Sequence, residues 1–279
     1  MKQFTSVSNL QQHLNTLRDQ GLVIGFVPTM GALHGGHLAL VESAQKNCDV
    51  VVVTIFVNPT QFNNEGDLSN YPKRTSEDLD LLQSANCDIV FMPSSEEVYP
   101  KDKPKFTIDL GKIATVMEGT HRPGHFQGVV NVVARFFEII QPHSAYFGQK
   151  DFQQVAVVEK LANDLEFDVS IVPVPTKRLS NGLAMSSRNY RLTDADKENA
   201  SIIYKTLLKG REWADKYSPA VTRQRMEEYF NTGKLELEYL RIVHPQSMEE
   251  LQHYWVDGAI AGIAAYCGEV RLIDNMKLS

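Results

Sequence analysis

The stretch that decides the fold is Leu22-Val-Ile-Gly-Phe-Val-Pro-Thr-Met-Gly-Ala-Leu-His-Gly-Gly-His37. Its first part, Leu22–Val27, is a continuous apolar run of the kind that forms a buried strand. Its end places two histidines, separated by two glycines, at the start of a helix predicted over Gly36–Asn47. A strand, a tight turn and a helix in this order predict the first half of a βαβ unit.

The same alternation of strand and helix patterns continues to about residue 176. The run Val50–Val57 is rich in β-branched residues and apolar throughout, as central parallel strands are. Further strands are predicted over Asp88–Met92, Ser144–Phe147 and Asp168–Val174, and helices over Ser76–Ala85 (capped by Ser76), Val129–Ile140 and Phe152–Asn163. This order predicts an α/β fold with a doubly wound, Rossmann-like parallel sheet.

After about Thr176 the pattern changes. Two surface helices are predicted, the first with Thr193 as its cap, and then three strands; the ranges are Leu192–Asp215, Val221–Thr232, Leu235–Val243, Gly258–Tyr266 and Glu269–Ile273. We therefore predict two domains: residues 1–176 with the parallel sheet, and residues 177–279 as a smaller α+β domain that serves as a lid.

The composition limits the classes of function that the protein can have. The chain has 279 residues and a net charge of −6, whereas proteins that bind nucleic-acid backbones usually carry a basic excess. The cysteines are widely spaced, which favours reduced thiols over disulfides or a paired metal motif. No signal-like apolar core precedes Asn9, and Val50–Val57 is too short for a membrane span of roughly 20 residues. We expect a cytoplasmic protein.

Polar and glycine-rich segments follow three of the predicted strands. They are Pro28–Gly31, Asn58–Gln61 and Gly148–Asp151. In doubly wound sheets, ligands bind beyond the carboxyl ends of the strands. The sequence therefore predicts a ligand site that these segments build.

His34-Gly-Gly-His37 carries the sharpest chemical signal. Histidines three residues apart on a first helical turn share a face, and a helix N-terminus offers unpaired N–H groups to anionic oxygens. The glycines remove side chains that would obstruct a phosphate. A pair of ordinary surface histidines is the alternative; a zinc site is less favoured because no third ligand has suitable spacing.

The His34–His37 stretch resembles the HxGH signature of nucleotidyltransferases, a superfamily that includes class I aminoacyl-tRNA synthetases. The longer string Pro28–His37 is similar to the pantothenate synthetase (pantoate–β-alanine ligase) family in particular. The other matching motifs follow in the family's order: Ile55-Phe-Val-Asn-Pro-Thr-Gln-Phe62, Arg122-Pro-Gly-His-Phe-Gln-Gly128, Ala145-Tyr-Phe-Gly-Gln-Lys-Asp-Phe-Gln-Gln154 and Ala184-Met-Ser-Ser-Arg-Asn189.

This resemblance implies an enzyme that condenses pantoate with β-alanine to give pantothenate, AMP and pyrophosphate. ATP is the co-substrate, pantoyl-adenylate the intermediate and Mg²⁺ the expected metal. A homodimer is expected from the resemblance alone. The resemblance also assigns ATP and pantoate binding to residues 1–176. Because the loop Ser186–Arg188 lies in residues 177–279, closure of this second domain is expected to complete the site.

The resemblance assigns roles to individual residues. His37, His34 and Lys150 are the expected catalytic residues; Gln61, Gln154 and, with less support, Asn58 are expected to bind pantoate and β-alanine. The residues expected to bind ATP are Met30, Gly31, Ala32, Leu33, His34, Gly35, Gly36, His37, Gly148, Gln149, Lys150, Asp151, Lys177, Met185, Ser186, Ser187 and Arg188. Asp78 is the candidate metal ligand.

Several of these residues have a structural alternative. Asp151 suits a helix cap, Asn58 suits a turn with Pro59, and Asp78 suits a charge in a first helical turn. Ser186–Arg188 suits a serine-rich turn. The sequence also departs from the family pattern, with Gln149 at a common Glu and His244 at a common Asp.

Two rival functions remain at this stage. A nucleotidyltransferase that makes a dinucleotide would share the histidine motif but should lack the paired glutamines Gln61 and Gln154. A non-catalytic nucleotide- or RNA-binding module should be basic, which the net charge of −6 opposes.

Overall fold

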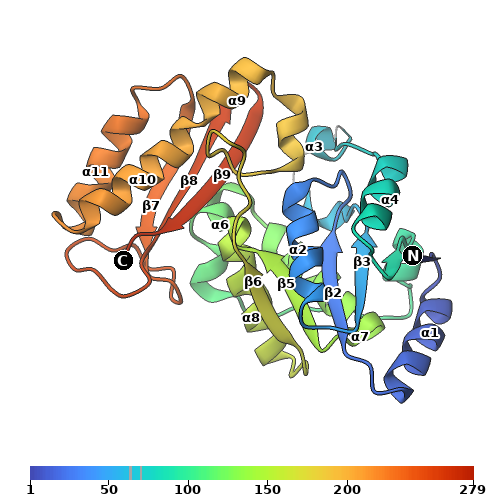
Figure 1. The fold of residues 1–279 in the computed structure, drawn as a ribbon. Coiled ribbons are helices and arrows are strands. Elements are labelled where there is room, and N and C mark those ends of the chain that lie inside the picture. Colours follow the sequence, from blue (N-terminus) through green and yellow to red (C-terminus); the bar gives the residue numbers. More distant parts are fainter. Residues whose placement is uncertain (63–64, 70) are drawn as a thin grey trace. The chain divides into compact units, whose positions relative to one another are not determined.

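The computed structural model describes residues 1–62, 65–69 and 71–279. They form two compact units (Figure 1). The first unit comprises residues 1–110, 122–148 and 153–175, and the second comprises residues 111–121, 149–152 and 176–279. Two short segments that precede residue 176 thus belong to the second unit. The predicted boundary at residue 176 and the predicted lid role of residues 177–279 stay predictions.

The first unit contains a parallel sheet, which confirms the predicted doubly wound fold. In the described part of the chain the sheet has six strands in the order β1-β4-β3-β2-β5-β6. The strands are β1 Lys2–Phe4, β2 Ile24–Thr29, β3 Val50–Ile55, β4 Ile89–Phe91, β5 Ser144–Gly148 and β6 Ser170–Val174. The edge strand β1, which pairs with β4, was not predicted, because three residues with one apolar side chain give no periodic signal.

Helices cover both faces of this sheet because its strands are apolar on both sides. Val27 and Val53 pack in one cluster with Val41 of helix α2, Gly35–Gln45. On the other face, Phe26 lies edge-on to Phe136 of helix α7, His125–Ile140, with ring centroids 5.7 Å apart. Burial on both faces is the arrangement expected for parallel strands.

The remaining helices of the first unit correct some predicted boundaries. Helix α4 begins one residue before Ser76, its N-cap is Arg74, and no side chain makes a capping hydrogen bond, so the predicted Ser76 cap is wrong. Helix α7 begins four residues before Val129, after Gly124 with φ +78°. The helices are α1 Val7–Asp19, α3 Glu65–Ser69, α4 Thr75–Ser84, α5 Ser95–Val98 and α8 Phe152–Asp164, the last of which starts in the second unit.

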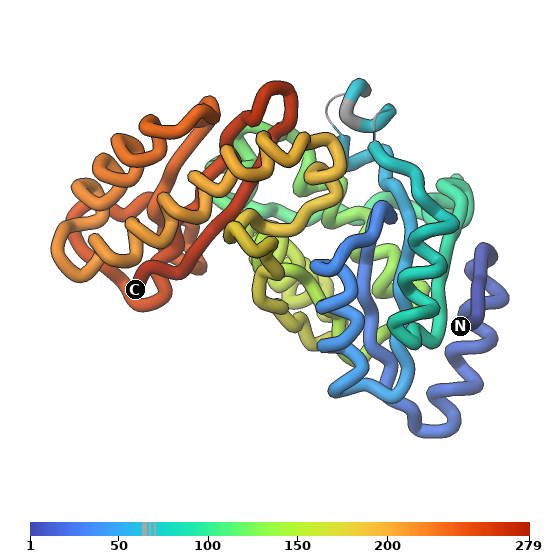
Figure 2. Tube along the Cα trace, turned by 45° about the horizontal axis from the view of Figure 1, so that its top comes forward, coloured from blue at the N-terminus to red at the C-terminus, as the bar shows by residue number. Residues whose placement is uncertain are grey.

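The second unit packs helices against an antiparallel sheet in the order β7-β8-β9 (Figures 1 and 2). Its core joins apolar residues of helices α10 and α11, such as Leu207 and Phe230, to strand residues such as Ile263. Thr193 caps α9 as predicted, but α9 and α10 meet at Ser201, so the single helix predicted over 192–215 is two helices. The elements are α6 Glu118–His121, α9 Asp194–Ala200, α10 Ile202–Ala214, α11 Pro219–Phe230, β7 Glu236–Val243, β8 Ile260–Cys267 and β9 Val270–Lys277.

A charged cluster attaches residues 111–121 to the sheet of the second unit. Arg271 of β9 donates to Glu118 at 2.7 and 2.9 Å and to Glu238 of β7 at 3.0 Å. The hydroxyl of Tyr239 also donates to Glu118, at 2.9 Å. Removing one partner from a cluster this buried would leave an uncompensated charge, so these contacts hold the segment firmly.

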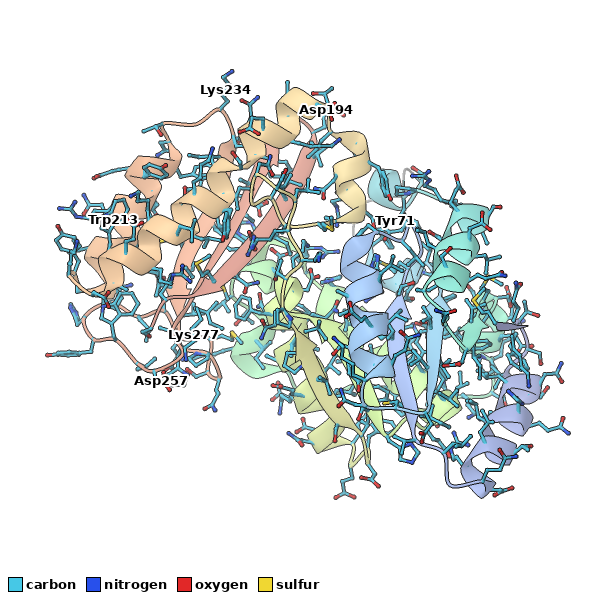
Figure 3. The ribbon with its side chains drawn as sticks, in the orientation of Figure 1. Tyr71, Asp194, Trp213, Lys234, Asp257 and Lys277 are labelled. Atoms are coloured by element: carbon cyan, nitrogen blue, oxygen red, sulfur yellow. The ribbon has the colours of Figure 1, made fainter. Side chains whose placement is uncertain are left out.

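Two expectations from composition can be compared with the structure. Cys48, Cys87 and Cys267 are free thiols, and burial raises the pKa of Cys87 to about 12. Among the described residues, no helix has both the length and the apolar character needed to cross a membrane. The exposed surface instead carries charged pairs such as Lys277 with Asp257, 3.2 Å apart (Figure 3).

Candidate functional site

The loop after β2 is held by one buried carboxylate. Asp78, from the first turn of α4, is 2% exposed and accepts hydrogen bonds from the backbone N–H groups of Ala32 at 2.9 Å and Leu33 at 2.6 Å. Gly31 and Ala32 both have positive φ, +81° and +49°. A Cβ on Gly31 would lie 3.0 Å from the Asp78 carboxylate, so the close approach of the loop requires glycine there.

The two histidines form a reciprocal cap at the start of α2. Nδ1 of His34 accepts from the N–H of Gly36 at 3.1 Å, and Nδ1 of His37 accepts from the N–H of His34 at 3.3 Å. Their ring centroids are 4.0 Å apart. Since Nδ1 accepts in both rings, the neutral rings carry their proton on Nε2, which makes each Nε2–H a donor. The predicted shared face of His34 and His37 is thus confirmed.

The position of this turn in the sheet suits a ligand site. Strand β2 lies between β3 and β5, and chain order reverses there. The loop 30–37 and Gly148, the last residue of β5, therefore lie at neighbouring carboxyl ends. A reversal of this kind is where ligands bind in open α/β sheets.

Asn58 serves the turn after β3. Its side chain is 1% exposed; Oδ1 accepts from the Tyr99 hydroxyl at 2.9 Å and the Thr60 hydroxyl at 3.0 Å, and Nδ2 donates to the carbonyl of Gly128 at 3.3 Å. It also caps the 3₁₀ turn Pro59–Gln61. The structure gives Asn58 the turn-fixing role that was the alternative; its predicted contact with pantoate stays a prediction.

The motif Arg122–Gly128, to which the sequence analysis gave no role, positions Gln61. The carbonyl of Gln61 accepts from His125 Nδ1 at 2.8 Å and from the Arg122 guanidinium at 3.4 Å. A Cβ on Gly128 would stand 2.3 Å from the carbonyl oxygen of Thr60, so only glycine permits this approach of α7. The resemblance located this motif in the sequence. Its structural role could not be predicted, because it depends on contacts with the distant residue Gln61.

Gln154 lies in the first turn of α8, after β5, and is partly exposed, whereas its neighbour Gln153 is 2% exposed. Gln61, which is 9% exposed, follows β3. Both predicted amides therefore stand beyond the carboxyl ends of strands in the same sheet.

The other predicted phosphate-binding residues belong to the second unit. Lys150 lies in the 3₁₀ turn Gln149–Asp151; its side chain is 15% exposed and its ammonium is 3.4 Å from Asp151. The 45% exposed Asp151 is therefore the ion partner of Lys150. The amide of Asn275 donates to the carbonyls of Gln149 and Lys150.

Residues 177–188 form a second local structure in this unit. The carbonyl of the exposed Lys177 accepts from the N–H of Met185 at 2.9 Å beside a bridge between Arg178 and Ala184. Ser186 caps a 3₁₀ turn that contains Ser187 and Arg188: its hydroxyl accepts from the N–H of Arg188 at 3.2 Å. This capped turn is the serine-rich turn that was the alternative for Ser186–Arg188. It fixes the backbone from which the Arg188 side chain extends.

The described residues contain no ready-made cluster of metal ligands. No group of three His, Cys, Asp or Glu side chains among them has the arrangement for a metal ion. Both oxygens of Asp78 already accept backbone hydrogen bonds that hold the loop, and burial raises the pKa of this carboxyl group. The metal role of Asp78 stays a prediction.

His244, a departure from the family pattern, has a structural explanation. Its Nδ1 accepts from the N–H groups of Gln246 and Ser247, each at 3.2 Å. An Asp carboxylate closes turns with the same two bonds. The imidazole of His244 therefore makes the two bonds that an Asp carboxylate makes in such a turn.

Comparisons with known proteins agree on one family. The family model for pantoate–β-alanine ligase matches residues 2–277. A pantothenate synthetase of Porphyromonas gingivalis is 45% identical over 99% of both chains. The crystal structure of pantothenate synthetase from Thermus thermophilus has a TM-score of 0.93 at 42% identity, covering 100% of this chain and 99% of its own. A Francisella tularensis pantoate–β-alanine ligase, solved with β-γ ATP and β-alanine, has a TM-score of 0.83 at 35% identity, covering 100% and 98%.

Replacing Asp78 by Ala should destabilise the first unit. The N–H groups of Ala32 and Leu33 would lose their acceptor inside the protein, and each unsatisfied group costs about 1–3 kcal/mol. Urea denaturation should show a loss of roughly 2–4 kcal/mol in the free energy of unfolding. Asp80→Ala, on the exposed side of the same helix, is the control. Equal stability of the two variants would contradict the role given to Asp78.

Gly128→Ala should also be destabilising. The added methyl would stand 2.3 Å from the Thr60 carbonyl oxygen, so α7 and the Gln61 turn must separate, and overpacking of this kind costs roughly 1–3 kcal/mol. Gly148→Ala is the matched control, because a Cβ there meets nothing within 4 Å. Thermal unfolding of both variants gives the comparison. If the Gly128 and Gly148 variants had the same melting temperature, the close contact at Gly128 would be unimportant for stability.

Proposed function

The chain belongs to the pantoate–β-alanine ligase family, and we propose that it condenses pantoate with β-alanine through a pantoyl-adenylate formed from ATP. The observation that carries this proposal is the family match over residues 2–277. The histidine cap at the carboxyl end of β2 supports it, since it puts two donors at a helix N-terminus. The Francisella tularensis relative solved with β-γ ATP and β-alanine supports both as substrates.

The proposed reaction has two steps. A carboxylate oxygen of pantoate attacks the α-phosphorus of ATP, and the bond from that phosphorus to the bridging oxygen breaks to release pyrophosphate. The amine of β-alanine then attacks the acyl carbon of the adenylate. The bond from the acyl carbon to the phosphate-linked oxygen breaks, AMP leaves with that oxygen, and the nitrogen loses a proton. Neither step needs a protein nucleophile, so catalysis consists of positioning and charge stabilisation.

His34 and His37 are proposed to stabilise the phosphate oxygens. Their Nδ1 atoms are engaged in the cap, which directs the donating Nε2–H groups to other partners. Gly35 and Gly36, between the histidines, have no side chains that would obstruct a phosphate at this turn. Charge that develops on the phosphates during adenylation would be met by donors that are already oriented.

Lys150, Ser187 and Arg188 are proposed to bind the phosphates that leave as pyrophosphate. The contact of Lys150 with the exposed Asp151 carboxylate is long, at 3.4 Å, so it does not fix the ammonium in place against binding an anion. The capped turn at Ser186 orders the backbone that carries Arg188, and an ordered guanidinium can bind phosphate through two donors. The other ATP contacts given in the sequence analysis stay part of this proposal.

Gln61 and Gln154 are proposed to bind pantoate. A neutral amide can donate to the carboxylate and accept from the hydroxyls without forming an ion pair that would weaken the nucleophile. The contacts of Arg122 and His125 with the Gln61 carbonyl fix the backbone of this residue. The rival of a dinucleotide-forming enzyme lacks these paired amides.

Three further expectations belong to the proposal. Mg²⁺ would enter with ATP, because this ion is commonly held by substrate phosphates and few protein ligands. A homodimer and a cytoplasmic location follow from the resemblance and the sequence. The RNA-binding alternative is disfavoured by the net charge of −6.

Pantoate should be required for the first step. Labelled pyrophosphate should enter ATP only when pantoate is present, and pantothenate should form only after β-alanine is added. Gln61→Ala and Gln154→Ala should each raise the KM for pantoate about 5- to 150-fold. Each change leaves hydrogen-bonding groups of the substrate unpaired, at a cost of about 1–3 kcal/mol. The KM for ATP should change little. Gln83→Ala, at an exposed position of α4, is the control. Exchange without pantoate would refute the proposed reaction.

Lys150→Ala should slow adenylation but not amide formation. Removing one preorganised donor typically lowers a rate by about 10²–10³-fold. Amide formation from supplied pantoyl-adenylate should change little, because the pyrophosphate has already left. Single-turnover kinetics separates the steps, with Lys160→Ala on α8 as control. His37→Ala should slow adenylation by the same order, with unfolding measured because His37 also caps α2. Equal slowing of both steps by Lys150→Ala would rule out its assignment to the phosphates.

A further inference from the structure

The turn that carries Lys150 is fastened by a residue outside every motif of the sequence analysis. Asn275 lies near the end of strand β9, and its side-chain nitrogen donates to the carbonyl oxygens of Gln149 and Lys150, each at 2.8 Å. One amide group with two N–H donors thus bridges two consecutive carbonyls. The residues involved all belong to the second unit.

This bridge determines where the lysine side chain points. Holding two successive carbonyls fixes the orientation of two peptide planes, and therefore the direction in which the Cβ of Lys150 leaves the backbone. The contact between Lys150 and Asp151 is a weaker constraint, since it measures 3.4 Å and Asp151 is 45% exposed. Exposed ion pairs of this kind contribute little. The backbone bridge is therefore the stronger determinant of the position of Lys150.

Asn275 is itself held rigidly. Its backbone N–H donates at 2.8 Å to Asp274, whose side chain is 2% exposed and accepts from the Arg178 guanidinium at 3.0 Å. Burial raises the pKa of Asp274, while Arg178 and, more weakly, Lys150 favour its charged form. The guanidinium of Arg178 also stacks on the ring of Tyr204, 4.3 Å from its centroid. An amide anchored in this way can impose its geometry on the turn.

The opposite strand leaves space for the residue that follows the turn. Gly262 of β8 is the register partner of Asn275. A Cβ on Gly262 would lie 3.5 Å from the ring of Phe152 and 3.2 Å from the sulfur of Met117. Phe152 therefore packs on the sheet at a glycine, while Asn275 binds the two carbonyls before it. The turn is held at both of its ends by neighbouring strands.

We propose that Asn275 is a positioning residue for the adenylation step, acting through the backbone of Lys150. The inference rests on the proposed role of Lys150 at the phosphates. It assigns a function to the last strand of the chain, which contributes no residue to the predicted site. A displacement of about 1 Å in a catalytic group can cost on the order of 10²-fold in rate, so a bridge of this kind matters beyond stability.

Asn275→Asp tests the proposal with an almost isosteric side chain. The carboxylate has no N–H to donate and would repel both carbonyl oxygens. Asn231→Asp, at the exposed end of α11, is the matched control, and Lys277→Ala controls for changes on β9 itself (Figure 3). Asn275→Ala provides a second variant if the Asp variant fails to fold. Each is combined with Lys150→Ala in a double-mutant cycle, and each step is measured in single turnovers.

The expected result is selective. Asn275→Asp should slow adenylation about 10- to 100-fold, and leave amide formation from supplied pantoyl-adenylate within about twofold. In the Lys150→Ala background the same change should cost less than about twofold, because the side chain it positions is gone. Both controls should retain the wild-type rate.

Other outcomes would overturn the inference. Normal adenylation in Asn275→Asp and Asn275→Ala, with slow adenylation in Lys150→Ala, would refute the positioning role and leave the proposed function intact. Equal slowing of both steps, or full additivity with Lys150→Ala, would show a merely structural role. Normal adenylation in Lys150→Ala would refute the phosphate role of Lys150, and this inference with it.

Discussion

The two hydrogen bonds from Ala32 and Leu33 to the buried carboxylate of Asp78 are the constraint on which the site depends. Ala32 has φ +49°, a conformation that costs a non-glycine residue energy and persists only where its surroundings enforce it. Asp78 provides that enforcement from a helix that follows β3 in the chain. The loop then delivers His34 in the extended conformation that a helix N-cap needs. A buried carboxylate outside the histidine motif thus fixes the loop that leads to both histidines.

A similar principle operates in the second unit, where charged pairs hold segments that the chain order would assign elsewhere. Arg271 holds residues 111–121 through Glu118, and the Asp274–Arg178 pair supports the amide of Asn275 that binds the Lys150 turn. Buried ionic contacts contribute less to net stability than to geometry, because desolvation offsets much of their attraction. Here these contacts fix the position of the turn that carries Lys150.

The sequence predicted the parts of the structure that depend on local patterns. The apolar run Val50–Val57 located the central strand β3, and the HxGH stretch located the start of helix α2. Prediction from sequence failed where contacts between distant residues determine the local structure. Ser76 suits a cap by composition, yet the helix starts at Thr75. For Asp78 the sequence suggested a first-turn helix charge or a metal ligand. It gave no sign of the loop contacts, because these partners lie 45 and 46 residues away. No local pattern marks Asn275, since its two side-chain hydrogen bonds form only when β9 meets the turn at Lys150.

The central claim, that pantoate is activated as an acyl-adenylate, can be tested by following oxygen atoms. Pantoate labelled with ¹⁸O in both carboxylate oxygens is converted to pantothenate, and the products are analysed by mass spectrometry. The account predicts one labelled oxygen in AMP, one in the new amide, and none in pyrophosphate. Unlabelled AMP, or label in pyrophosphate or inorganic phosphate, would contradict attack on the α-phosphorus and with it the proposed function.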